Sequence, residues 1–371
     1  MVWKLAKIIL VPALLLAFAT SVQAADPRPV AKMGGTYQFY GQVSPAYLGF
    51  NDGAQTSGLV VDNSNSQSRV GLWYRRPFLW GRFNVNFETA IGVRGSNSVS
   101  QNHQANNWDW ASSEVRKAEL IWETARFGTF YIGQGSMASD GVSNRDLSGT
   151  SIVSYVGIVN TAGAFFLRTQ AGALSPVAVG VAFPNFDGGR RTRVRYDTKP
   201  YRGFTVSASI GEQTLSNYIK TQDSDVVLRY DADFPKFTIA AAGGYTWINR
   251  KTAANDRTII GSFSIEHKAT GISFTTSSGT RNTQGNYRYF KLGYKAEFPR
   301  TGPFSVSVDY YGANNMAIDG SRSESFGVGI LKRLSNPRIE AYLGLRTYRF
   351  TEPSARYQDA SSAMFGARWK F

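Results

Sequence analysis

Hydrophobic and polar residues alternate along much of this chain. In the segment 363–371, apolar side chains occupy the odd positions Ala363, Phe365, Ala367, Trp369 and Phe371. A period of two residues is typical of a β-strand with one apolar face and one polar face. The same alternation recurs in many other segments, so we expect an all-β protein.

Runs with this period, bounded by Gly, Pro, Asn and Asp, predict sixteen strands. The predicted strands start near Gly35, Gln67, Arg82, Glu114, Gly128, Arg190, Phe204, Ser224, Phe237, Asp256, Ile272, Gly285, Phe304, Ser323, Arg338 and Ala360. An even number of strands places both ends of a barrel on the same side of a membrane.

The predicted connections alternate between short and long. The short links are Pro77 to Gly81, Thr124 to Phe127, Pro200 to Gly203, Asp233 to Lys236, Lys268 to Gly271, Pro299 to Gly302 and Leu334 to Pro337. The polar strand faces carry Ser, Thr, Gly and charged residues, which cannot fill a dry core. We therefore expect a closed transmembrane antiparallel β-barrel in an outer membrane.

The first residues have the features of an export signal. Lys4 and Lys7 precede an apolar run over 8–18, and small residues end the segment at Ala24. We expect residues 1–24 to be removed as a signal peptide and 25–371 to form the barrel. Cysteine is absent, so neither disulfides nor thiolate metal sites stabilise this fold.

The chain is basic, with 41 Lys and Arg against 26 Asp and Glu. Basic charge is common in nucleic-acid-binding proteins, but the export signal argues against that partner. At the inward positions of the expected strands, cations outnumber carboxylates. Because sixteen strands enclose an aqueous channel, we expect passive diffusion of small hydrophilic solutes with a weak anion preference.

One connection is much longer than the others. It spans 135–189, between the strand ending near Gln134 and the strand starting at Arg190, whereas typical connections have about 4 to 6 residues. Long insertions of this kind are usually functional. This segment is the third long loop in the predicted order.

Several short motifs, in order along the mature chain, match one known family. They are Tyr40-Gly41-Gln42, Asn65-Ser66-Gln67-Ser68-Arg69, Arg116-Lys117-Ala118-Glu119, Gly133-Gln134-Gly135-Ser136, Asp146-Leu147-Ser148-Gly149-Thr150, Val194-Arg195-Tyr196-Asp197 and Trp369-Lys370-Phe371. On these motifs the chain resembles the general trimeric porins of Gram-negative bacteria, in the form found in alphaproteobacteria. The resemblance implies that the third loop folds into the barrel and narrows the pore, and that three barrels associate as a homotrimer.

The resemblance also suggests which side chains form the pore constriction. Asp140 and Asp146 would be the acidic residues of the loop, while Arg69, Arg193 and Arg195 would be cations of the barrel wall. Arg145 departs from the acidic loop pattern and dilutes its negative charge. That departure argues against transferring a cation preference to this chain.

The fourth predicted strand gives two conflicting registers. Alternation places Lys117 and Glu119 inward, with Ala118 and Leu120 outward. The family resemblance instead makes Arg116 the pore cation. Arg116 and Lys117 are therefore two alternatives for the inward residue.

The sequence argues against an enzyme. The chain contains two histidines, His103 and His267, on opposite sides of the predicted membrane, and no nucleophile elbow, zinc spacing or phosphate loop accompanies them. We expect no cofactor. The same barrel pattern is compatible with a substrate-specific channel for a sugar, peptide or oxyanion, or with a non-conducting surface anchor or adhesin. Small residues such as Gly41, Val43 and Ala46 on the first strand are candidates for contact between copies.

Overall fold

The computed structural model describes residues 28–29, 34–215, 221–250, 253–298, 302–334 and 338–371. The predicted signal peptide, residues 1–24, lies outside these ranges. Parts of two predicted short links, at 299–301 and 335–337, also lie outside them.

Most described residues belong to one antiparallel sheet. The barrel is built from β2 (Thr36–Val43), β3 (Pro45–Asn51), β4 (Thr56–Asp62), β5 (Arg69–Phe78), β6 (Gly81–Ala90), β7 (Val115–Thr124), β8 (Gly128–Ser136), β11 (Arg190–Asp197), β12 (Phe204–Glu212), β13 (Thr221–Asp233), β14 (Phe237–Arg250), β15 (Asp256–His267), β16 (Ile272–Arg281), β17 (Asn286–Ala296), β18 (Phe304–Asn314), β19 (Arg322–Arg333), β20 (Ile339–Thr351) and β21 (Ala360–Lys370). The remaining elements are β1 (Arg28–Pro29), η1 (Ser112–Glu114), α2 (Val159–Ala162), β9 (Phe166–Arg168), β10 (Leu174–Ala178) and α3 (Val179–Ala182).

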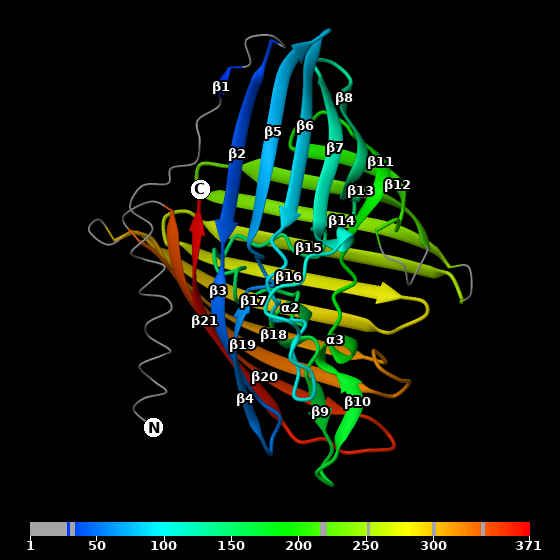
Figure 1. Ribbon diagram of the computed structural model, residues 1–371, viewed down its shortest axis with the longest axis vertical. Helices are drawn as coiled ribbons and strands as arrows, with labels where there is room; N and C mark the ends of the chain where they lie inside the picture. Colours follow the sequence, from blue (N-terminus) through cyan, green and yellow to red (C-terminus); the bar gives the residue numbers. More distant parts are fainter. Residues whose placement is uncertain (1–27, 30–33, 216–220, 251–252, 299–301, 335–337) are drawn as a thin grey trace.

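These segments form a closed barrel of sixteen strands, as predicted. β2 and β3 are two halves of the first strand, since both pair with β21; β4 and β5 are likewise two halves of the second, pairing with β3 and β2. The backbone of Gly41 closes the ring by exchanging hydrogen bonds of 2.9 and 3.0 Å with Phe371. Figure 1 shows the strands of the front and back walls crossing at a large angle, as tilted barrel strands do.

The second strand begins earlier than the sequence predicts. Its first half starts at Thr56 and not near Gln67, because the strand makes a detour over residues 63–68 and then resumes. Asp62 holds this detour by accepting hydrogen bonds from the backbone N–H and the hydroxyl of Ser68, at 2.7 and 2.6 Å.

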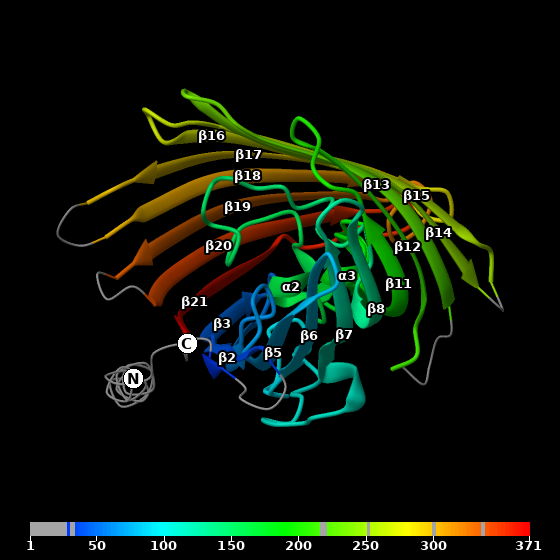
Figure 2. The ribbon, with the colours of Figure 1, turned by 90° about the horizontal axis from the view of Figure 1, so that it is seen from above.

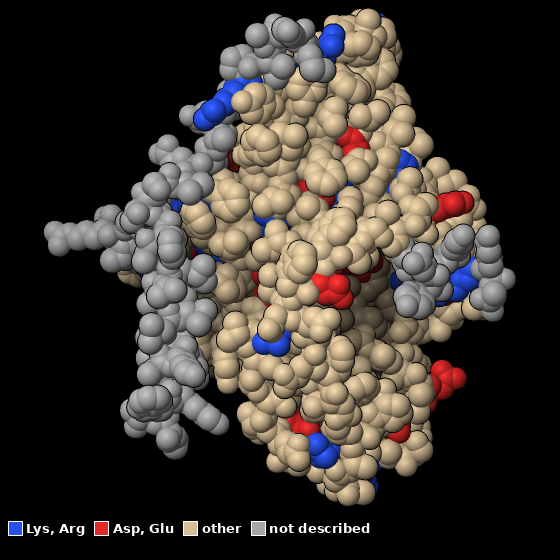
Figure 3. Space-filling view, in the orientation of Figure 1, with Lys and Arg blue, Asp and Glu red and all other residues tan. Residues whose placement is uncertain are grey.

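Apolar side chains lie on the outer face of the strands and polar side chains on the inner face, as the alternation predicts. On β18, Val308 is 52 % exposed on the outside, whereas Asp309 is 5 % exposed on the inside. Most of the surface visible in Figure 3 is uncharged, with Lys, Arg, Asp and Glu scattered over it. No helix among the described residues is long and apolar enough to cross a membrane.

Most of the third loop, predicted at 135–189 and found at 137–189, lies inside the barrel, as predicted, while the hairpin β9–β10 projects at its end (Figure 1). Figure 2 shows α2 and α3 enclosed by the ring of strands. The ring of Phe165 stacks on Phe50 of β3 with centroids 4.3 Å apart, and Phe183 packs against Tyr311 of β18 and Tyr348 of β20. The hydrophobic core of this protein therefore lies between the loop and the inner face of the wall.

Candidate functional site

Two arginines of β11 hold the start of the third loop. The Arg193 side chain, 2 % exposed, forms an ion pair with Glu119 of β7 and donates hydrogen bonds to the carbonyls of Ser136 and Gly133, at 3.1 and 3.0 Å. Arg195 forms a bidentate pair with Asp197, both bonds 2.8 Å long, and donates to the Met137 carbonyl at 3.1 Å. Both guanidinium groups are thus engaged where the loop leaves the wall.

Asp146 fixes the first part of the third loop to the wall at β17. Its carboxylate lies 2.7 Å from the ammonium group of Lys291 on β17, and it accepts the backbone N–H of Ser148 at 2.8 Å. The two charged side chains are 4 % and 0 % exposed. Lys291 keeps the pKa of the Asp146 carboxyl below its usual value against the opposing effect of burial. This carboxylate is paired against the wall and does not face open water.

Arg145 points toward the wall as well. Its guanidinium forms an ion pair with Asp231 of β13, while its backbone N–H donates to the Ser262 hydroxyl of β15 at 3.1 Å. The preceding acid, Asp140, lies near Asp187 and Arg190, with which it interacts electrostatically.

Asp187 stabilises the turn that contains Asp140. Its carboxylate accepts the backbone N–H groups of Gly141 and Ser143, both at 2.9 Å. Burial, with a further contribution from the charge of Asp140, raises the pKa of Asp187 to about 6. Asp187 therefore titrates close to neutral pH.

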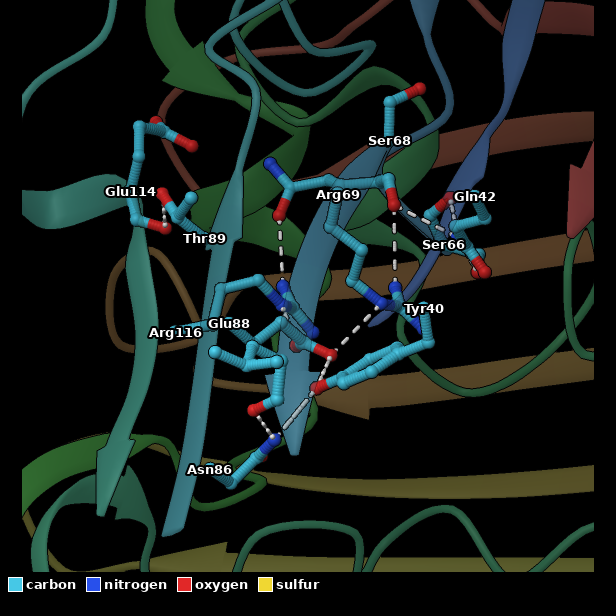
Figure 4. A network of polar contacts seen from close by, with 12 residues as sticks. Tyr40, Gln42, Ser66, Ser68, Arg69, Asn86, Glu88, Thr89, Glu114 and Arg116 are labelled. Carbon is cyan, nitrogen blue, oxygen red and sulfur yellow. Dashed lines mark hydrogen bonds and ion pairs between the residues drawn. The ribbon is translucent and has the colours of Figure 1, made fainter. Parts of the chain in front are cut away.

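The wall formed by β2 and β5–β7 carries a polar network centred on Glu88 (Figure 4). The Glu88 carboxylate accepts a 2.7 Å hydrogen bond from Arg116 and lies 3.4 Å from Arg69. The Tyr40 hydroxyl donates to the same carboxylate at 3.1 Å, and Arg116 also donates to the side chain of Gln67 at 3.1 Å. Two guanidinium groups therefore share one carboxylate.

A β-bulge explains why alternation and the family resemblance disagreed about the inward residue of β7. Glu88 of β6 pairs with Lys117, but the next residue, Thr89, pairs with Val115. Arg116 is the extra residue of the bulge, and the change in direction lets its side chain reach Glu88 while Glu119 stays on the inner face. The structure places Arg116 in the network, and Lys117 also interacts electrostatically with Glu88.

A second carboxylate on the wall is shared by three cations. Glu340 of β20 lies 3.1 Å from Arg333 and 3.4 Å from Lys370, and it accepts a 2.7 Å hydrogen bond from Nε of Arg368. Arg368 is close enough to Arg69 to repel it electrostatically, so the two clusters form one continuous cationic region.

Arg190 belongs to the same region but was not among the predicted site residues. Alternation from Thr192 and Val194, which face outward, places Arg190 on the outer face of β11. As the first residue of the strand, it instead interacts electrostatically with Arg116, Glu88 and Asp140. The repeated arginines of the segment 190–195 were the only sequence signal for it.

The two histidines lie outside this region. His103 is in the loop between β6 and β7, and His267 ends β15, where its Nδ1 lies 2.9 Å from the Thr270 hydroxyl. Among the residues that the structure describes, no group of His, Cys, Asp and Glu is placed to hold a metal ion.

Comparison with known proteins identifies relatives of this architecture. The family described as Gram-negative porin matches residues 13–353. The anion-selective porin from Comamonas acidovorans has a similar structure, with a TM-score of 0.61, 14 % identity and coverage of 91 % of this chain and all (100 %) of that one. OmpT of Vibrio cholerae gives a TM-score of 0.59, 14 % identity and 93 % and 100 % coverage. OmpF of Salmonella typhi, in complex with daunomycin, has a TM-score of 0.57 and 10 % identity, with coverage of 93 % of this chain and 100 % of that one. A comparison with curated protein sequences gave no match.

Proposed function

Because this chain belongs to the Gram-negative porin family and forms an outer-membrane channel for the diffusion of small solutes, we propose that the channel has a weak preference for anions. The wall cations supply this preference. A water-filled channel bounded by protein and lipid of low dielectric constant concentrates ions of the charge opposite to its lining.

The main observation is the excess of cations around the two wall carboxylates. Glu88 is shared by Arg69 and Arg116, and Glu340 by Arg333, Arg368 and Lys370. Each carboxylate can neutralise only one of its partners. The wall therefore keeps a net positive charge, to which Arg190 adds.

The third loop offers little negative charge to compensate. Asp146 is neutralised by Lys291 in a buried pair, and Arg145 adds a cation of its own. Asp140 and Asp187 are the remaining loop acids of this site. We propose that Arg69, Arg116, Arg190, Asp140 and Asp187 line the narrowest part of the channel, with Arg193, Arg195, Arg145 and Asp146 positioning the loop.

A reversal-potential measurement tests the proposed preference. The purified protein is reconstituted into a planar bilayer of neutral lipid, and a KCl gradient is applied at pH 7. We expect a reversal potential with the sign of chloride permeation and a chloride-to-potassium permeability ratio modestly above one. A potential with the sign of potassium permeation would refute the proposal.

We propose that the protein assembles as a homotrimer and has no enzymatic activity. The small residues predicted for the contact are partly covered, since Ala46 is 4 % exposed and the ring of Phe371 lies against Gly41. The neighbouring outer surface instead presents Phe39, Val70 and Phe87, which are 57 %, 43 % and 45 % exposed. A mass of one subunit in mild detergent would count against the trimer.

A further inference from the structure

The inner face of β5 leads from the Glu88 network toward the periplasmic end of the barrel. Its side chains follow one another about 7 Å apart, in the order Arg69, Gly71, Trp73 and Arg75. Arg75 lies close to the short turn between β5 and β6, and short turns mark the periplasmic end of such barrels. A solute that moves from the Glu88 network toward the periplasm therefore reaches Trp73 and then Arg75.

Two aromatic rings lie along this path. The Tyr40 ring of β2 lies over Gly71, where an added Cβ would come within 2.3 Å of it, and its hydroxyl reaches Glu88 (Figure 4). The Trp73 ring follows, with its centroid 6.5 Å from that of Tyr40 and 29° between the two ring planes. The missing side chain at Gly71 thus lets Tyr40 lie against the wall and form an aromatic pair with Trp73.

Arg75 is held over the Trp73 ring. Its guanidinium carbon Cζ lies 4.6 Å from the centroid of that ring, and its Nη1 donates a 3.0 Å hydrogen bond to the side-chain oxygen of Gln38. These two contacts orient the guanidinium group before any solute arrives. Trp73 and Arg75 are both half-buried, and because they lie on the inner face, their exposed parts face the channel.

The positive charge of Arg75 is not neutralised by a contact. In the part of the chain that the structure describes, Arg75 has no ion-pair partner. Glu123 interacts with it electrostatically, but the Glu123 carboxylate is hydrogen-bonded to Arg82 at 2.6 Å and to Asn84 at 3.0 Å. That acid is therefore committed to other side chains, and the remaining N–H groups of Arg75 are available to a solute.

We propose that Trp73 and Arg75 bind aromatic carboxylates as these pass through the channel. A carboxylate accepts two parallel hydrogen bonds from a guanidinium group. The flat ring attached to it packs against the pair formed by Tyr40 and Trp73 in an offset arrangement. A small anion without a ring uses only the first of these contacts, so the site favours acids that carry a ring. The proposal rests on the preference of the channel for anions and names a class of organic anion that the wall would select.

Block of the ion current by small molecules tests the proposal. The purified protein is reconstituted into planar bilayers at pH 7 and constant ionic strength, and benzoate, benzamide or acetate is added on both sides. Benzamide has the ring without the charge, and acetate has the charge without the ring. We expect benzoate to reach half-block at a concentration about tenfold below that of benzamide and about fivefold below that of acetate. Equal half-blocking concentrations of benzoate and acetate would overturn the proposal, because the ring would then contribute nothing.

Substitutions separate the contribution of the ring from that of the charge. Trp73→Leu should make benzoate no better a blocker than acetate, while the reversal potential in a KCl gradient stays at the wild-type value. Arg75→Gln should raise the half-blocking concentration of benzoate about tenfold, to that of benzamide. Arg75→Lys should recover only part of the block, because an ammonium group cannot bind a carboxylate with two parallel hydrogen bonds. Wild-type block by benzoate in both Trp73→Leu and Arg75→Gln would place the site elsewhere and overturn the proposal.

Lys295→Gln is the matched control. Lys295 is a cation on the inner face of β17, where it pairs with Glu266 at 2.6 Å, so its loss removes the same charge from the channel outside the site. The half-blocking concentration of benzoate should stay within about twofold of the wild-type value. An equal loss of block in Lys295→Gln and Arg75→Gln would overturn the proposal in favour of the general field of the channel. A reversal potential with the sign of potassium permeation would instead refute the anion preference, and the comparison of benzoate with benzamide would still decide whether the site exists.

Discussion

The Asp146 carboxylate of the third loop and the Lys291 ammonium group of β17 lie 2.7 Å apart in a buried ion pair. The pair joins the first part of the loop to the back wall of the barrel. Neighbouring contacts reinforce it, since Thr150 and Ser307 share a 2.6 Å hydrogen bond and Ser154 bonds to Asp309. The position of the loop, and with it the width of the channel, therefore depends on polar contacts with the wall.

We predict that Asp146→Ala loosens the loop. The substitution leaves Lys291 buried without its counter-charge, which in buried pairs costs about 3–5 kcal/mol. Single-channel recordings should show a larger and noisier open-channel current, and thermal unfolding should occur at lower temperature. Asp233→Ala is the control, because Asp233 pairs with Lys268 at 2.6 Å in a pair whose Asp side chain is 72 % exposed. Wild-type current and stability in Asp146→Ala would contradict the anchoring role.

Substitutions around Glu88 should shift the ion preference in opposite directions. Arg116→Gln removes a wall cation and should lower the chloride-to-potassium permeability ratio about twofold, whereas Glu88→Gln should raise it by a similar factor. Reversal potentials under a KCl gradient measure both. Arg349→Gln, which changes an outward-facing arginine paired with Asp359, should leave the ratio unchanged. Shifts of the same sign in Arg116→Gln and Glu88→Gln would rule out charge as the cause.

The anion preference should increase as the pH falls from 7 to 5. The pKa of Asp187 is raised to about 6, mainly by burial, so the carboxyl takes up a proton and loses its negative charge over this interval. Nearby Arg190 stays charged, and the local potential becomes more positive. Asp187→Asn should reduce the change in reversal potential, whereas Asp359→Asn, in an extracellular loop, should retain it in full. A chloride-to-potassium permeability ratio of the wild-type protein that is the same at pH 7 and pH 5 would contradict the prediction.

Gly133→Ala should destabilise the barrel next to the start of the third loop. Gly133 has a φ of +116°, and a Cβ there would lie 2.3 Å from the Ala118 carbonyl oxygen. We expect the free energy of unfolding to fall by about 1–3 kcal/mol. On gels, the band of the folded barrel should then disappear at a lower temperature than in the wild-type protein. Gly243→Ala is the control, because an added Cβ at Gly243 meets no atom within 4 Å. Equal effects of the two substitutions would exclude backbone strain as the cause.

The barrel could be predicted from the sequence because each strand has one face toward lipid and the other toward the polar interior of the barrel. Neighbouring residues such as Val308, which faces outward, and Asp309, which faces inward, must differ in polarity, so the strand can be recognised from the sequence. The first half of the second strand, β4, was missed because the detour after Asp62 breaks that period. Local hydrogen bonds, and not the hydrophobic pattern, bring the strand back into register.

The site was harder to predict than the fold, because a charged side chain on an inner face can face water or another part of the protein. Sequence identified Arg193 and Asp146 as charges near the loop, but their burial depends on Glu119 and Lys291, which are distant in the chain. Arg116 and Arg190 reach the wall network through a bulge and a strand end, two places where alternation fails.

The hydrogen bonds between Gly41 and Phe371 have a consequence for biogenesis. The first strand lacks one of its two neighbours until β21 has been synthesised and exported. During that interval β2 is an unpaired edge that can add strands from other chains and aggregate. This exposure ends only when the hydrogen bonds between Gly41 and Phe371 form, so the last strand of the barrel protects the first.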